Sequence, residues 1–135
     1  MKNHLREIAA RYPRLFENGV APQWSYVFPG WSDLVEQLCA DLDAALPPGQ
    51  GLRVVQVKEK FGGLRFYYHV DAAGDLANAL TKIKAEAENR SFKMCEGCGV
   101  ASAVRLHGGW YTTLCPACLA VVRAERAAER AREQD

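Results

Sequence analysis

Two short stretches, KMCEGCG at residues 93–99 and LCPACL at residues 114–119, decide how the C-terminal part of this chain folds. They contain four of the five cysteines, arranged as two C-x2-C pairs that are separated by 16 residues. Zinc prefers four tetrahedral ligands, and a gap of two residues lets one tight turn present two thiolates to the same ion. The spacing therefore predicts one structural Zn²⁺ ion, bound by Cys95, Cys98, Cys115 and Cys118.

The residues around the two pairs predict the order of the local structures. Residues 103–106 and 110–114 are expected to form two strands joined at a His-Gly-Gly turn, and the sequence after Cys118 is strongly helical. A metal-binding turn, then a hairpin, then a helix resembles a treble-clef zinc finger, and a simpler zinc ribbon is the alternative. We expect His107 to lie in the turn of the hairpin and not to bind the metal.

Four thiolates fill the coordination shell of zinc and leave no position for water, so the predicted metal stabilises the fold and does not catalyse a reaction. Redox chemistry is the alternative for C-x-x-C, but a thioredoxin-type site has a single pair next to a βαβ unit. The sequence contains no GxSxG, Walker A or HExxH motif. We therefore expect no enzymatic activity.

The rest of the chain predicts a small α+β unit. Helical periodicity marks residues 5–12, 31–46 and 75–90, and two β-rich runs surround a Phe-Gly-Gly turn. We also expect a third strand within residues 20–30, because a lone hairpin is marginally stable in water. The predicted fold is α+β, with residues 1–92 as an α+β domain (helix, helix, β-hairpin, helix) and residues 93–135 as a four-cysteine zinc module that ends in a helix.

Alternation along the first hairpin separates a core face, which Val55 and Val57 are expected to join, from a polar face. The polar face and the turn combine basic side chains, which contact phosphates, with aromatic side chains, which stack on bases. An ordinary solvated face is the alternative. The candidate ligand-binding residues are Lys58, Lys60, Phe61, Arg65, Tyr67 and His69.

Other residues are candidates for binding a protein partner. Tryptophan and tyrosine dominate interface hot spots, and core packing is the alternative for at least two of the candidates. The charges of the last helix, RAERAAERARE, are expected to pair at i, i+4, and we expect a monomer or a weak homodimer. Cys39 lies in an apolar helical stripe and is expected to be a buried, unreactive thiol. The candidate partner-binding residues are Trp24, Trp31, Trp110 and Tyr111.

Composition and charge exclude several classes of protein. A net charge of +1 gives no signal for binding driven by bulk charge, and 49% hydrophobic residues are typical of a folded domain. The start, MKNHLREIAARYPRLF, lacks the unbroken apolar stretch of a signal peptide, and no run is long enough for a membrane span. We expect a cytoplasmic protein without membrane association, where disulfides are rare.

The run QVKEKFGGLRFYY, with GWSDLVEQLC upstream and CEGCG and GGWYTTLC downstream, resembles a group of small bacterial and bacteriophage proteins of uncharacterised function. In that group a similar hairpin precedes a paired C-x-x-C segment, and the likeness extends from Gly30 to Cys118. The resemblance implies a prokaryotic or bacteriophage protein of the cytoplasm and brings no activity with it.

Two functions stay open at this point. The first is a non-enzymatic, zinc-stabilised protein that binds nucleic acid through its basic and aromatic hairpin. The second is a protein-binding inhibitor, an immunity or anti-defence factor that blocks a host or toxin protein. A steep dependence of nucleic-acid affinity on salt is expected for the first and not for the second.

Overall fold

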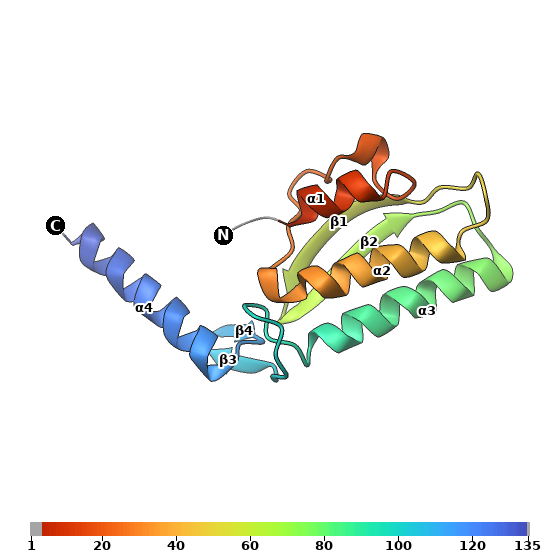
Figure 1. The fold of residues 1–135 in the computed structure, drawn as a ribbon. Coiled ribbons are helices and arrows are strands. Elements are labelled where there is room, and N and C mark those ends of the chain that lie inside the picture. Colours follow the sequence, from red (N-terminus) through yellow and green to blue (C-terminus); the bar gives the residue numbers. More distant parts are fainter. Residues whose placement is uncertain (1–3, 135) are drawn as a thin grey trace.

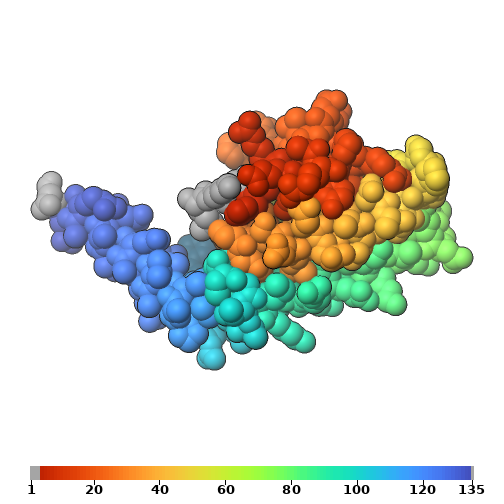
Figure 2. All heavy atoms as spheres, in the orientation of Figure 1, coloured from red at the N-terminus to blue at the C-terminus, as the bar shows by residue number. Residues whose placement is uncertain are grey.

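The computed structural model describes residues 4–134 and confirms the α+β class, with a C-terminal helix that follows a cluster of four cysteines. In Figure 1 three helices lie on one side of the first hairpin, and Figure 2 shows the last helix as a protruding arm. No helix in this part of the chain has the length and apolarity to cross a membrane. In chain order the elements are α1 (Leu5–Arg11), η1 (Glu17–Gly19), η2 (Pro29–Trp31), α2 (Ser32–Ala45), β1 (Arg53–Lys60), β2 (Gly63–His69), α3 (Gly74–Ser91), β3 (Arg105–His107), β4 (Trp110–Thr112) and α4 (Pro116–Glu133).

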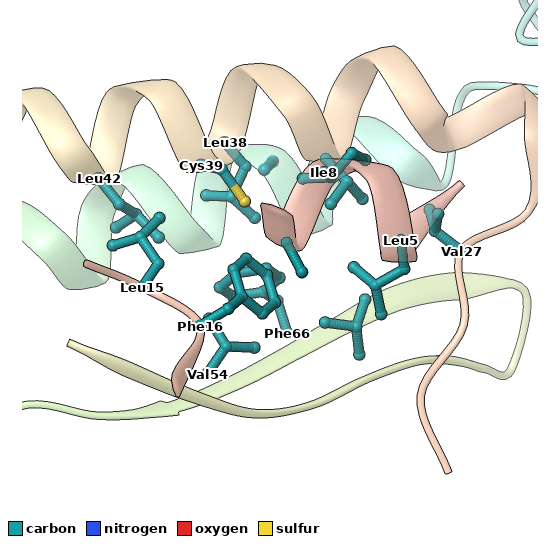
Figure 3. Packing of buried hydrophobic residues seen from close by; sticks show 14 of the residues in the cluster. Leu5, Ile8, Leu15, Phe16, Val27, Leu38, Cys39, Leu42, Val54 and Phe66 are labelled. Carbon is teal, nitrogen blue, oxygen red and sulfur yellow. The ribbon is translucent and has the colours of Figure 1, made fainter. Parts of the chain in front are cut away.

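The hydrophobic core lies between the three helices and the inner face of β1–β2. Figure 3 shows the rings of Phe16 and Phe66 at its centre, facing Leu38 and Cys39 of α2. The thiol of Cys39 is fully buried, and this burial raises its pKa to about 12. The prediction that Cys39 is buried is therefore confirmed.

The first hairpin contains a register shift between Val54 and Gln56. A β-bulge at Val55 reverses the alternation of faces for the residues that follow it. Val54 and Val57 are consequently both buried, whereas Val55 is partly exposed. The prediction that Val57 faces the core is confirmed, and the prediction for Val55 is wrong.

The expected third strand is absent from residues 20–30 in the described structure. This segment instead runs irregularly along β1, where the backbone N–H of Tyr26 donates to the carbonyl of Val57 at 2.9 Å. The backbone N–H of Val57 in turn donates to Oγ of Ser25 at 3.0 Å. A loop thus satisfies part of the edge that a strand was expected to cover.

The outer edge of β2 is covered by side chains of α3. The backbone N–H of Leu64 donates to Oγ of Ser91 at 2.8 Å, and that of Phe66 donates to Oε2 of Glu88 at 2.9 Å. Unpaired edge groups are a liability of small sheets. Because both edges make these contacts, a two-stranded sheet that would be marginal alone becomes part of a stable fold.

The cysteine-containing segment packs directly against η2. The backbone N–H of Gly30 donates to the carbonyl of Glu96, and Nε1 of Trp31 donates to the carbonyl of Met94, both at 2.9 Å. A Cβ atom on Gly30 would lie 2.0 Å from the carbonyl oxygen of Cys95, so only glycine fits there. Trp31 is 1% exposed, which corrects its assignment as a partner-binding residue: the indole packs in the core.

A second contact joins this segment to the turn of β1–β2. Both turn residues, Phe61 and Gly62, have positive φ values of 56° and 85°, as expected for a two-residue hairpin turn. Oγ1 of Thr113 donates to the carbonyl of Gly62 at 2.5 Å. The cysteine-containing segment therefore contacts the turn of the first hairpin.

Candidate metal centre and binding surfaces

The first cysteine pair lies in a tight turn that backbone hydrogen bonds close. The N–H of Cys95 donates to the carbonyl of Val100 at 2.7 Å, and the N–H of Gly99 donates to the carbonyl of Cys95 at 2.8 Å. Cys95 is fully buried, while Cys98 is exposed. The first pair therefore presents one inner and one outer thiol.

The second pair is positioned by the beginning of α4. Cys115 is the N-cap residue, and its Sγ accepts a hydrogen bond from the backbone N–H of Cys118 at 3.4 Å. Pro116 follows at the first helical position, where its missing N–H leaves no intrahelical bond unmade. Capping thus places both thiols of this pair at the same end of the helix.

The four thiols converge on one point. The Sγ atoms of Cys95, Cys98, Cys115 and Cys118 all lie within 4.8 Å of one another, and the distance between Sγ of Cys98 and Sγ of Cys115 is 3.7 Å. A tetrahedron with metal–sulfur bonds of about 2.3 Å has edges of about 3.8 Å. A disulfide requires a bond of about 2.05 Å, and all five cysteines are free thiols. The cluster is therefore suited to bind one metal ion.

The electrostatics of the cluster also suit a cation. Burial raises the pKa of Cys95, but hydrogen bonds from the backbone amides of Cys115, Cys98 and Gly97 outweigh burial and bring the pKa to about 6. Burial and the neighbouring thiols raise the pKa of Cys118. The protein alone therefore favours one thiolate and disfavours its neighbour. A divalent cation supplies the positive charge that lets all four cysteines ionise.

The side of β1–β2 that faces away from the core is hollowed into an open cavity of about 860 Å³, which we call the outer-face cavity. Trp24, in the loop along β1, is 82% exposed at one side. Lys84 of α3 stands at the other side, where its Nζ lies 5.6 Å from the ring centroid of Tyr67. The cavity is lined by Gln23, Trp24, Val55, Gln56, Lys58, Tyr67, Tyr68, His69 and Lys84.

The structure places three of the six candidate ligand-binding residues in the cavity. Of the others, Lys60 and Phe61 lie at the turn, and Arg65 lies opposite Lys58 in the hairpin. Nζ of Lys60 lies 5.5 Å from the ring centroid of Phe61. The guanidinium carbon of Arg65 lies 5.9 Å from the ring centroid of Phe92. The three candidates that line the outer-face cavity are Lys58, Tyr67 and His69.

The cavity also contains two residues that the sequence did not assign to ligand binding, Lys84 and Trp24. Helical periodicity does not say which strand lies beside a polar helix face, so the sequence gives no signal for Lys84. Trp24 was grouped with the other tryptophans, although it stands at the outer-face cavity with a positive φ of 62°. Few non-glycine residues adopt such a φ, which often marks a functional position.

A second exposed apolar surface lies where the two hairpins meet. The rings of Phe61 and Tyr111 are in edge-to-face contact, with 6.2 Å between their centroids, and Leu106 pairs with Tyr111 across β3–β4. These residues, the hairpin-tip patch, are 61%, 49% and 59% exposed, respectively. Trp110 is 70% exposed, but it neighbours Tyr111 in β4 and therefore points to the other face.

No family model, curated protein or solved structure matches this chain. Its function is therefore inferred from the chemistry of three features: the four-thiol cluster, the outer-face cavity and the hairpin-tip patch. The four thiols of the cluster face one another, whereas the cavity and the patch present side chains to solvent.

Proposed function

We propose that the protein binds single-stranded nucleic acid in the outer-face cavity, on a scaffold stabilised by one Zn²⁺ ion. The observation that supports this most directly is the arrangement of Trp24, Tyr67 and two lysines around one open cavity. Unpaired bases offer flat rings for stacking, and the backbone offers phosphates to lysine. A duplex keeps its bases stacked inside. A single strand is therefore the form whose bases can stack on the aromatic rings while its phosphates contact the lysines.

Trp24 is the principal stacking platform in this proposal. Its side chain is 82% exposed, and its backbone has the positive φ of 62° that non-glycine residues rarely adopt. Stacking of a base on such an exposed indole contributes about 1–3 kcal/mol of binding free energy.

The charges around the cavity favour an anionic ligand. Lys58 and Lys84 contribute positive charge, and no acidic side chain is among the described residues that line the cavity. Nζ of Lys84 has one carboxylate neighbour, Oε2 of Glu88 at 4.0 Å. Lysines that contact phosphates release counterions, so the affinity for nucleic acid is expected to depend on salt.

The metal has a structural role in the proposed function. Thiolates select soft or borderline ions, and four of them in a tetrahedron are the usual ligands of structural zinc. A shell of four protein ligands leaves no position for water, so the ion supplies stability and not reactivity. Because Thr113, beside the second cysteine pair, donates to the carbonyl of Gly62, the metal-bound segment would also contact the turn at the end of the hairpin that carries the cavity.

Binding is tested by titrating the metal-loaded protein with a short single-stranded oligothymidylate. In a Trp110→Phe background, Trp24 is the only exposed indole because Trp31 is buried, so quenching of its fluorescence reports stacking directly. The affinity should fall steeply between about 50 mM and 200 mM salt. By fluorescence anisotropy of a labelled strand, Trp24→Ala should weaken binding between about fivefold and 150-fold, which corresponds to 1–3 kcal/mol.

The role of the lysines is tested with Lys58→Ala/Lys84→Ala against a control that changes charge elsewhere. Lys82→Ala is the control, since Lys82 is exposed on α3 and does not line the cavity. The double variant should lose affinity and show a shallower salt dependence, while the control should change both much less. Absence of binding at low salt, or an equal loss per charge in the control, contradicts the proposal.

The hairpin-tip patch favours a second candidate function, which is recognition of a protein partner. Its three side chains are apolar or aromatic and exposed, as expected of an interface hot spot. The test is retention of one protein, resistant to nuclease, from a lysate of the native host. Loss of that protein with Phe61→Ala/Tyr111→Ala but not with Trp24→Ala favours this candidate over nucleic acid.

A further inference from the structure

A groove with a volume of about 380 Å³ lies between the β3–β4 hairpin and α4. Its apolar part comes from Leu114, Leu119 and Val122. One wall presents His107 and Thr112 of the hairpin. The other wall presents three arginines of α4, namely Arg123, Arg126 and Arg130.

The charges of α4 are not arranged in opposite pairs at i, i+4. Arg123, Arg126 and Arg130 are spaced by three and four residues and therefore share one side of the helix. The predicted pairing at i, i+4 is wrong, because this spacing joins Arg126 to Arg130 and Glu125 to Glu129. Among residues 4–134, none of the ion pairs lies within α4. Like charges at this spacing repel one another, and an anion in the groove relieves that repulsion.

The hairpin wall contains unused hydrogen-bonding groups. Nε2 of His107 and Oγ1 of Thr112 are both shielded from solvent and have no hydrogen-bond partner in the described part of the chain. Such buried groups are normally paired. Because both residues line the groove, these atoms are candidates to bond a ligand there. Arg105, which pairs with Thr112 across the hairpin, adds a further positive charge on the same face.

We propose that this groove binds a phosphate group. The inference goes beyond the function proposed above, since no residue that lines the groove also lines the outer-face cavity. Guanidinium groups match phosphate oxygens with two parallel hydrogen bonds. The phosphate belongs either to a small phosphate compound or to the backbone of a nucleic acid, and the two sources are separated by experiment.

The geometry favours phosphate over carboxylate. A carboxylate presents two oxygens in one plane, which suits a single arginine. A phosphate presents its oxygens in tetrahedral directions. Donors that approach from α4 on one side and from the hairpin on the other can therefore each meet a different phosphate oxygen, whereas the oxygens of a carboxylate lie in one plane.

The test compares Arg126→Ala with Arg132→Ala in the full-length, metal-loaded protein. Both substitutions remove one positive charge from α4, but Arg132 does not line the groove. Alanine is the best helix former, so neither change should disturb the helix. Inorganic phosphate, pyrophosphate and a short oligothymidylate are titrated by isothermal calorimetry. Arg126→Ala should weaken the binding of at least one probe about tenfold or more, and Arg132→Ala by less than about twofold.

The pattern of results identifies the source of the phosphate. Binding of inorganic phosphate or pyrophosphate that depends on Arg126 supports a small phosphate compound, and dependence seen only with the oligonucleotide supports a backbone phosphate. Lys58→Ala/Lys84→Ala should leave the small probes unaffected, so failure of the outer-face proposal is recognised separately. If no probe depends on Arg126, or if a glutamate-rich peptide binds there more tightly than every phosphate probe, the inference is overturned.

Discussion

The N-terminal part and the C-terminal part of this chain differ in how much apolar surface they bury. The N-terminal part has a cluster of 20 buried residues, whereas the C-terminal part has three, two of which are the cysteines Cys95 and Cys115. No residue of α4 is buried. Burial of apolar surface can stabilise the first part, but the second part is too small for that and contains instead a four-thiol cluster that could hold a metal ion. One short chain thus combines a hydrophobic core with a segment arranged around a candidate metal site.

Removal of the metal should have the largest effect and should be confined to the C-terminal part. Structural zinc contributes about 10–16 kcal/mol of apparent binding free energy in small modules, so a chelator should unfold the cysteine-containing segment. Hydrogen exchange should show loss of protection around residues 95–119 and retention in α2 and β2. Equal loss in α2 would mean that the two parts fold as one unit, and the contrast between them would disappear.

A matched pair of cysteine variants controls for a general effect of losing a thiol. Cys98→Ser should reduce bound zinc to well below one equivalent per chain, because it removes one of the four converging thiols. Cys39→Ala should keep one equivalent, since Cys39 is buried in the core and outside the cluster. The measurement is metal analysis of the purified proteins.

Loss of a core ring should destabilise the N-terminal part without affecting the metal. Phe66 is fully buried, and Phe66→Ala should lower the free energy of unfolding by about 3–5 kcal/mol through lost burial and a cavity. Phe61→Ala, at a position that is 61% exposed, should change it by only about 0.5 kcal/mol. Denaturant unfolding measures both, and similar losses would show that the core does not dominate stability.

A substitution at the contact between the two parts should have an intermediate effect on both. Gly30→Ala places a Cβ atom 2.0 Å from the carbonyl oxygen of Cys95, so the backbone must shift at a cost of about 1–3 kcal/mol. Zinc affinity should fall as well, because the shift moves the first cysteine pair. Gly49→Ala is the control: its φ of 80° imposes strain, but nothing lies near its Cβ, and zinc affinity should stay unchanged.

The smallest expected effect concerns the ion pair between Arg11 and Glu36, at the surface of the N-terminal part. Nε of Arg11 donates to Oε1 of Glu36 at 2.9 Å, and this hydrogen bond lowers the pKa of Glu36. A lowered carboxyl pKa stabilises the folded state above the unfolded pKa of about 4.3, and the gain is lost as the pH falls through the folded pKa. Glu36→Gln should therefore lower the Tm slightly at neutral pH.

In acid, below the folded pKa of Glu36, the Tm difference between Glu36→Gln and the wild type should shrink toward zero, because the wild-type carboxyl is then protonated. Glu129→Gln, on the exposed helix α4, serves as the control and should alter the Tm less at either pH. A difference that persists unchanged in acid would mean that Glu36 acts through packing and not through its charge.

The metal cluster could be predicted from sequence because its ligands are fixed by local structure. A two-residue gap within a turn or a helix cap sets where a pair of thiols points, whatever the rest of the chain does. The α+β class followed in the same way from periodicity and from the Phe-Gly-Gly turn. Binding of a Zn²⁺ ion by this cluster stays a prediction.

Some residues have surroundings that the sequence did not predict, because those surroundings depend on contacts between distant segments. One bulged residue, Val55, reversed the faces of β1, and an alternating pattern of valines does not reveal such a bulge. Trp24 and Trp31 are seven positions apart, yet one is 82% and the other 1% exposed. Trp24 lies at the cavity beside β1, and Nε1 of Trp31 donates to the carbonyl of Met94. Both environments include residues that are far from the two tryptophans in the sequence.

The covered edges of the β1–β2 sheet have a consequence for self-assembly. Ordered aggregates grow when a strand of one molecule adds to a free sheet edge of another. Here Ser25 and Tyr26 occupy one edge, and Glu88 and Ser91 the other. All four residues precede the first cysteine pair, so a molecule that has lost its ion still offers few free groups for fibril growth.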